Sequence, residues 1–136
     1  MRYILDACAL IAYLHDEQGS DVINELLKKA VDDEVEIYIS IVNLLEVHYA
    51  NVRDLGKDQA DVILEKVLSI PIKVVSVISN KTFHEAARLK TTYKMSLGDC
   101  IGLATAIEFS GQFVTSDHHE LGPVAEQTPQ FIFWFR

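Results

Sequence analysis

Residues 3–6 read Tyr-Ile-Leu-Asp and residues 113–117 read Phe-Val-Thr-Ser-Asp, so each of two short β-like runs leads into an aspartate. Largely apolar runs of this length are typical of strands that are buried on both faces, as in a parallel sheet. In open α/β folds, ligands bind beyond the carboxyl ends of the strands, which meet at one edge of the sheet. We therefore expect Asp6 and Asp117 to lie together at that edge.

Five such runs divide the sequence, at residues 3–5, 36–40, 72–77, 112–115 and 130–135. Between them, apolar residues recur at helical spacing in Ser20–Val31 and Ala60–Leu68, and a further helix is expected over Gly98–Phe109. Strands joined by helical connections predict an α/β fold in three layers, with a central five-stranded parallel sheet flanked by helices. The 136 residues contain no repeat and no linker-like stretch, so we expect a single domain over residues 1–136.

Composition narrows the class of protein further. Hydrophobic residues make up 49% of the chain and charged residues 24%, which excludes disordered and collagen-like proteins. The formal net charge of −8 has the wrong sign for holding nucleic acid by charge alone, unless divalent cations bind some of the acids. The N-terminal apolar run contains Asp6 and is too short to span a membrane. We expect a cytoplasmic protein without a membrane partner, with Cys8 and Cys100 as free thiols.

Two more acids lie close to the same edge of the predicted sheet. Glu46 follows the run 36–40 within an apolar helical segment that Ser40 can cap. Asp99 lies in the first turn of the helix that starts at Gly98. Small residues recur at four-residue spacing in that helix, which would let it approach a neighbour closely: Gly98, Gly102 and Ala106.

Each acid also has a purely structural interpretation. Asp6 and Asp99 can cap the helices that begin beside them, and Ser96 with Asp99 fits a capping box. Asp117 can begin a turn, and Glu46 can face solvent from an amphipathic helix. The four acids together favour one common site, because two follow strands directly and two lie early in helices that begin at the same edge of the sheet.

Clustered carboxylates have a definite chemical meaning. Three or four of them within a few ångströms repel one another unless a cation joins them. Ligation by oxygen alone suits a hard ion such as Mg²⁺ or Mn²⁺. Such an ion polarises phosphoryl oxygens and activates water for in-line attack, so the pattern predicts hydrolysis of phosphodiester bonds.

Four segments, in this order, resemble the motifs of a known family. They read Tyr-Ile-Leu-Asp-Ala-Cys-Ala-Leu-Ile-Ala at 3–12, Leu-Leu-Glu-Val at 44–47, Ser-Leu-Gly-Asp-Cys-Ile-Gly-Leu-Ala-Thr-Ala at 96–106 and Val-Thr-Ser-Asp-His-His-Glu-Leu at 114–121. Along nearly its whole length the chain resembles PIN-domain ribonucleases of the VapC-like toxin type. The resemblance implies a PIN-like fold and a metal-dependent endoribonuclease, the toxin of a toxin–antitoxin pair. It also implies a homodimer that a small DNA-binding antitoxin neutralises.

The resemblance further implies roles for individual residues. It carries over four acids that act in catalysis and bind the metal: Asp6, Glu46, Asp99 and Asp117. Thr115 becomes a supporting hydroxyl. Cys8 stands where the family usually has Ser or Asn, and Ser116 stands where Asn is frequent, so both are expected to support the ligands. A thiol donates weaker hydrogen bonds than a hydroxyl, so the support from Cys8 is where this chain departs from the family.

Cations are concentrated just before the helix that carries Asp99. Four of them fall within fourteen residues: Lys81, Arg88, Lys90 and Lys94. We expect them to contact RNA phosphates on the approach to the site, the alternative being an ordinary solvated helix face. The acidic cluster should also accept an Arg or Lys from the antitoxin, because four carboxylates with one divalent ion remain net negative.

Other residues and functions stay open at this stage. His118 and His119 could bind a metal or contact RNA phosphates, and Glu120 could be an outer acid of the site. Two alternatives to the ribonuclease are a catalytically silent PIN-like module that binds protein and a receiver-like phosphoacceptor that binds Mg²⁺. The four-acid set argues against the first, and the lack of an acid after the run 72–77 argues against the second. A homodimer is expected through apolar helix faces such as Leu26, Leu27 and Ile63.

Overall fold

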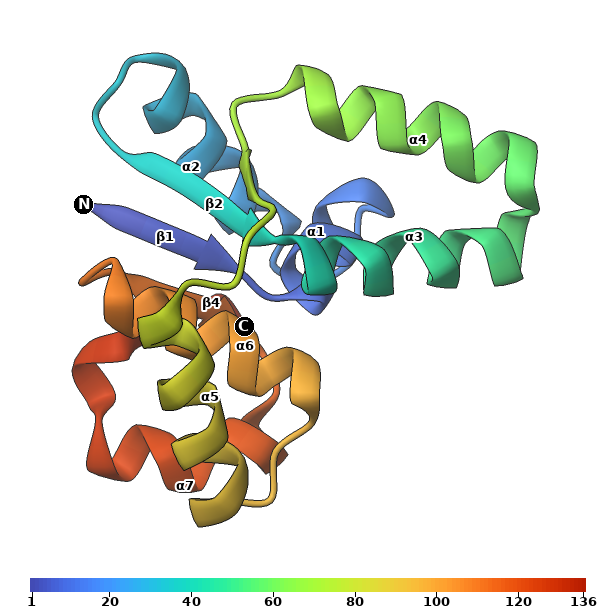
Figure 1. Cartoon of the computed structure of the whole chain (residues 1–136). Coiled ribbons are helices and arrows are strands. Elements are labelled where there is room, and N and C mark those ends of the chain that lie inside the picture. The colour runs from blue at the N-terminus through green and yellow to red at the C-terminus, as the bar shows by residue number, and fades with distance from the viewer.

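A five-stranded parallel sheet forms the centre of the computed structural model, which describes all residues 1–136 (Figure 1). Its strands follow the order β3-β2-β1-β4-β5 and comprise β1 (Arg2–Leu5), β2 (Glu36–Ser40), β3 (Lys73–Val75), β4 (Gln112–Thr115) and β5 (Ile132–Trp134). The helices are α1 (Ala7–Leu14), α2 (Ser20–Val31), α3 (Ile41–Leu55), α4 (Lys57–Ser69), α5 (Asn80–Thr92), α6 (Leu97–Glu108) and α7 (His118–Gln127), with a short 3-10 turn at Pro129–Phe131.

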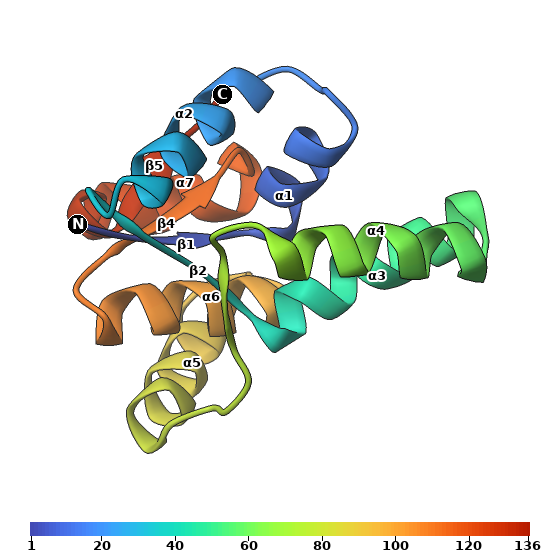
Figure 2. The same cartoon turned by 90° about the horizontal axis from the view of Figure 1, so that it is seen from above.

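Helices lie on both faces of the sheet. In Figure 2 the sheet is seen nearly edge-on, with α1 and α2 on one side and α5 and α6 on the other. This arrangement confirms the predicted α/β fold with a central five-stranded parallel sheet. No helix in the structure combines the length and the apolar character that a membrane span needs.

The two edge strands are shorter than the sequence predicts. The run 72–77 forms a strand only over Lys73–Val75, and the run 130–135 forms one only over Ile132–Trp134. Each of these strands has a neighbour on one side only. About half of its backbone N–H and C=O groups therefore have no hydrogen-bond partner in the sheet, which favours a short strand. Pro129 also begins the 3-10 turn that precedes β5.

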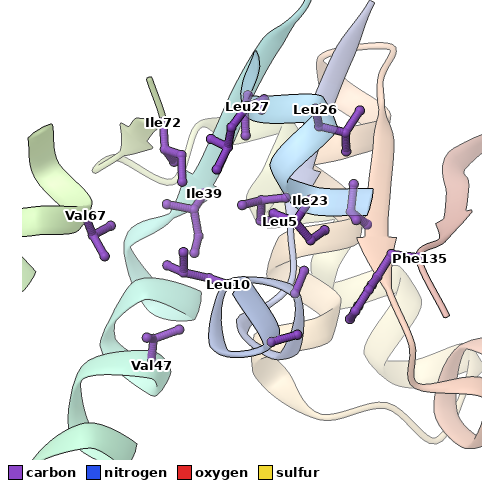
Figure 3. Close-up of a cluster of buried hydrophobic side chains, with 14 of the residues drawn as sticks. Leu5, Leu10, Ile23, Leu26, Leu27, Ile39, Val47, Val67, Ile72 and Phe135 are labelled. Atoms are coloured by element: carbon purple, nitrogen blue, oxygen red, sulfur yellow. The ribbon is translucent and has the colours of Figure 1, made fainter. Parts of the chain in front are cut away.

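Strand β1 is the centre of the core because it is covered on both faces. Its successive residues Ile4 and Leu5 are both fully buried, and they belong to two separate apolar clusters, one for each face of the sheet. The Leu5 cluster gathers side chains from α1, α2, β2 and α3, including Leu10, Ile23 and Ile39 (Figure 3). The sheet is therefore a buried platform that fixes the positions of its strand ends.

The surface expected for dimerisation is part of this core. Leu26 and Leu27 are each 5% exposed and pack on the sheet of their own chain (Figure 3). Ile63 of α4 also packs against the same cluster. The expectation that Leu26 and Leu27 form an interface between two copies was wrong, because one face of an amphipathic helix cannot serve both purposes.

Candidate metal centre

Asp6 caps α1 and at the same time points into the acidic edge of the sheet. It directly follows β1, and its Oδ1 accepts a hydrogen bond of 2.7 Å from the backbone N–H of Ala7. Its other oxygen, Oδ2, accepts 2.7 Å from the Thr115 hydroxyl and 3.2 Å from the Cys8 thiol. Capping and membership of an acid cluster are thus compatible, since the two oxygens of one carboxylate serve different partners.

Cys8 and Ser116 belong to the same network as Asp6. The Ser116 hydroxyl donates to the Cys8 sulfur at 3.6 Å, and that sulfur lies 3.8 Å from the Thr115 hydroxyl. Burial, followed by the negative charge of Asp6, raises the pKa of the Cys8 thiol to about 12. The thiol therefore keeps its proton and can donate it to the Asp6 carboxylate.

Asp99 lies three residues after the capping residue Ser96, where an acid can complete a capping box, but its carboxylate does not do so. Ser96 caps α6 by accepting a hydrogen bond of 3.2 Å from the backbone N–H of Asp99. In a complete capping box the Asp99 carboxylate would accept the Ser96 N–H in return. Here that N–H donates instead to Glu120 Oε1, at 3.1 Å. Asp99 is only 6% exposed, and its carboxylate is left available to interact with the other acids.

Asp117 and Glu120 approach Asp99 from α7. Asp117 caps this helix, and its Oδ1 accepts 3.0 Å from the backbone N–H of Glu120. One carboxylate oxygen from each of Asp99, Asp117 and Glu120 lies within 4.8 Å of the other two. Glu120 is thus part of the tightest acidic group. The sequence signal for its place at the site is its spacing of three residues from Asp117, because residues three apart share one face of a helix.

Glu46 reaches the cluster from α3. Its Oε1 accepts 2.9 Å from the side-chain amide of Asn43, and its carboxyl group lies directly against Gly98 of α6. Neither Glu46 nor Asp6 belongs to the group within 4.8 Å, but both are electrostatically linked to it. The structure therefore gathers all four predicted acids and adds Glu120.

Burial, followed by mutual repulsion, makes it costly for the carboxylates of this cluster to be charged. Burial raises the pKa of Asp99 to about 9, aided by its hydrogen bond with Glu120 and by the charges of Asp6, Glu120 and Asp117. The same hydrogen bond, as the main cause, holds the pKa of Glu120 below its usual value. Burial also raises the pKa of Asp6 and of Glu46. The cluster alone therefore retains a proton on Asp99 at neutral pH.

The donor set fits a hard divalent cation. Every group at the centre is a carboxylate, and the sulfur of Cys8, beside Asp6, is already engaged with Asp6, Thr115 and Ser116. Mg²⁺ and Mn²⁺ prefer such oxygen ligands, and a divalent charge offsets both the burial of these carboxylates and the repulsion between them. Asp99, Asp117 and Glu120 are the residues placed to hold the ion, with Asp6 and Glu46 beside them.

The four predicted basic residues are not equally close to the acids. Lys90 donates 2.6 Å to the carbonyl of Met95, and Lys94 lies in the link that leads into α6. Arg88 pairs with Glu85 at 2.6 Å. Lys81 lines a surface hollow with Glu108, the last residue of α6, about 14 Å along the helix from Asp99. The structure brings Lys90 and Lys94 to the end of α6 that bears Asp99, and it does not bring Lys81 there.

The two histidines after Asp117 have different surroundings. The ring of His118 stacks on Trp134, with centroids 4.0 Å apart, and its Nε2 lies 2.9 Å from the carbonyl oxygen of Arg136. His118 therefore anchors the C-terminal residues to α7. His119 is the histidine near the cluster, where its charge contributes to the lowered pKa of Glu120.

Comparisons with known proteins agree with this architecture. A family model described as PIN domain matches residues 3–123. A chain of VapBC2 from Rickettsia felis, solved with a promoter DNA fragment, gives a TM-score of 0.74 at 20% identity, with 98% of each chain covered. A chain of a toxin–antitoxin complex from Klebsiella pneumoniae gives a TM-score of 0.66 at 18% identity, with 98% of each chain covered. A chain of VapBC-1 from nontypeable Haemophilus influenzae gives a TM-score of 0.71 at 14% identity, and the match covers 99% of this chain and 98% of that chain. No curated protein sequence matches the chain.

Proposed function

Because this chain belongs to the PIN domain family, we propose that it is a divalent-metal-dependent endoribonuclease and the toxin of a toxin–antitoxin pair. The observation that carries the proposal is the convergence of Asp99, Asp117 and Glu120, flanked by Asp6 and Glu46. A catalytically silent module would have no need to keep so many mutually repelling carboxylates in one place.

The proposed chemistry follows from the acids and their supports. When bound, Mg²⁺ or Mn²⁺ supplies a Lewis acid for the phosphoryl oxygen and a water of lowered pKa. Asp99, Asp117 and Glu120 would hold the ion through their carboxylate oxygens. Thr115 and Cys8 fix the Asp6 carboxylate in one orientation by donating to its Oδ2. Because these hydrogen bonds orient the carboxylate in advance, no conformational entropy is lost in aligning it during each catalytic cycle.

The RNA strand would enter beside the link between α5 and α6. Lys90 and Lys94 lie at that end of α6, where they can contact phosphates without selecting bases. Arg88 can join them by releasing Glu85, since its own side chain is 52% exposed and an ion pair at the surface is weak.

An antitoxin is proposed as the partner that silences the site. One of the structures with this fold is a toxin–antitoxin complex. A partner's Arg is suited to the net-negative acidic group through bidentate pairing, and Lys can bind there as a point charge. Such a cation would compete with the metal and exclude RNA together. The homodimer belongs to the same proposal, through a surface other than Leu26 and Leu27.

Incubating the purified protein with structured and unstructured RNAs, with and without Mg²⁺, tests the activity. We expect cleavage that EDTA abolishes and that Asp99→Asn lacks, while the metal-free variant unfolds at the same or a higher temperature because an uncharged amide folds without taking up a proton. Cleavage by Asp99→Asn at the wild-type rate would refute the assigned site.

Co-expression with the adjacent reading frame tests the partner. A complex that elutes as one species in size-exclusion chromatography and has lost ribonuclease activity is expected. A free monomer with unaltered activity would contradict both the antitoxin and the homodimer.

A further inference from the structure

We infer that Asn43 is a positioning residue that holds the Glu46 carboxylate against the start of α6, beside Asp99. This inference rests on the proposed metal site. Unlike Asp6 and Asp117, Glu46 neither follows a strand nor caps a helix. Asn43 is the only side chain in the structure that donates a hydrogen bond to it, at 2.9 Å.

The amide of Asn43 is fully buried and each of its polar atoms has a partner. Its Nδ2 donates to Glu46 Oε1 and, at 3.2 Å, to the carbonyl of Gly98. Its Oδ1 accepts 2.7 Å from the Ser40 hydroxyl, which itself accepts the backbone N–H of Asn43 at 3.0 Å. Two acceptors on one side and a hydroxyl donor on the other fix which way the amide points. Asn43 therefore cannot rotate without losing hydrogen bonds in a buried place.

The neighbouring helix is shaped to receive this pair. A Cβ added at Gly98 would lie 2.8 Å from Cδ of Glu46, and one added at Gly102 would lie 2.8 Å from Oδ1 of Asn43. The two glycines are four residues apart, as are neighbouring positions on one helix face. Asn43 and Glu46, three residues apart on α3, thus lie over the bare backbone of α6.

The consequence is a fixed relation between two acids on different helices. Gly98 immediately precedes Asp99, so the amide that holds Glu46 is also bonded to the backbone next to Asp99. Partners that orient metal ligands in this way typically change metal affinity by about 10- to 100-fold when they are removed. We expect Asn43 to act on the metal through Glu46, without touching the substrate.

Asn51 provides a matched control on the same helix. It is also a buried asparagine of α3, but its side chain bonds to His15 at 2.9 Å and has no contact with the acids. Asn51→Ala should lower stability without affecting the metal site. Asn43→Ala removes the donor to Glu46, and Asn43→Leu does so while keeping the same branched side-chain skeleton if the alanine variant fails to fold.

The test combines Mn²⁺ titration calorimetry, kcat and KM on RNA, and crystal structures of the metal-free variants. We expect both Asn43 variants to bind Mn²⁺ at least about tenfold more weakly, with kcat reduced and KM nearly unchanged. We also expect the Glu46 carboxylate to leave its place against Gly98. Asn51→Ala should keep the wild-type Mn²⁺ affinity.

Failure of this inference differs from failure of the proposed function. Mn²⁺ affinity within twofold of wild type, with Glu46 unmoved in the crystal, would reduce Asn43 to a structural residue. A wild-type protein that binds Mn²⁺ but cuts no RNA would overturn the ribonuclease and leave the Asn43 comparison intact. If the wild-type protein binds no Mn²⁺, the position of Glu46 in the variant crystals still decides whether Asn43 holds it.

Discussion

Cys8 serves as a hydrogen-bond donor to Asp6, and substitution of this one residue tests how much the donor matters. Cys8→Ser retains a hydroxyl donor, whereas Cys8→Ala leaves Asp6 Oδ2 with the Thr115 hydroxyl alone. We expect the serine variant to match or exceed the wild-type Mn²⁺ affinity and the alanine variant to lose up to about tenfold. Calorimetric titration with Mn²⁺ measures both. Equal affinities in the two variants would show that the thiol gives no support.

A residue of the site could be predicted where the neighbouring sequence alone shows its place in the fold. Asp6 and Asp117 could be placed because each follows a strand, and the parallel sheet brings such ends together. Asn43 could not be placed, because its bond to the Gly98 carbonyl joins positions 55 apart in sequence. Glu120 shares a helix face with Asp117, but only the fold shows that this face turns toward Asp99.

Among the elements, α6 depends on having no side chain at Gly98. Gly98→Ala would force a Cβ against the Glu46 carboxylate. We expect a loss of roughly 1–3 kcal/mol in the free energy of unfolding, together with weaker Mn²⁺ binding. Urea unfolding and metal titration are the measurements.

Gly122 of α7 is the control for this substitution. A Cβ added there meets nothing within 4 Å. Gly122→Ala should therefore stabilise the protein by about 0.4–1 kcal/mol, because the unfolded chain loses conformational freedom. Destabilisation of both variants to the same extent would mean that contact with Glu46 is not the cause.

Helix prediction succeeded where the apolar pattern was uninterrupted. The stripe in Ser20–Val31 predicted α2 with the bounds that the structure has. The sequence does not predict helix α7, because Gly122 and Pro123 lie within it and Asp117 is also typical of a turn. The cap that Asp117 provides and the packing of Leu121 and Val124 on the core outweigh these two breakers.

For the whole molecule, the acidic cluster predicts a stability that falls with rising pH when no metal is present. The pKa of Asp99 is raised from 3.8 to about 9, so the folded protein binds a proton that the unfolded chain has released in this range. The free energy of unfolding should therefore decrease between these two pH values. Urea unfolding at a series of pH values would show the slope.

Two controls separate this effect from other titrating groups. Asp99→Asn should flatten the slope, and Mg²⁺ should restore stability at the alkaline end, because it replaces the proton as the counter-charge. A wild-type slope that is unchanged in Asp99→Asn would assign the pH dependence to residues outside the cluster.

The distribution of charge over the molecule predicts where RNA binds. Replacing Lys90 and Lys94 with Ala in an Asp99→Asn background should weaken RNA binding and reduce its salt dependence by roughly 0.7 for each phosphate that is no longer neutralised. Lys28 and Lys29 form the control pair, since they lie in the last turn of α2, before the start of β2. Filter binding at several salt concentrations distinguishes the pairs, and equal effects would indicate only a general loss of positive charge.

The order of the strands also bears on what happens during translation. The central strand β1 leaves the ribosome before the other four strands, yet one of its neighbours is β4, whose residues are 112–115. The acids are spread from Asp6 to Glu120, so most of the chain must emerge before they can meet. A nascent chain, or a product that a premature stop codon ends before β4, lacks both that strand pairing and the last two acids, Asp117 and Glu120. Under the proposed function, such fragments are harmless to the cell that makes them.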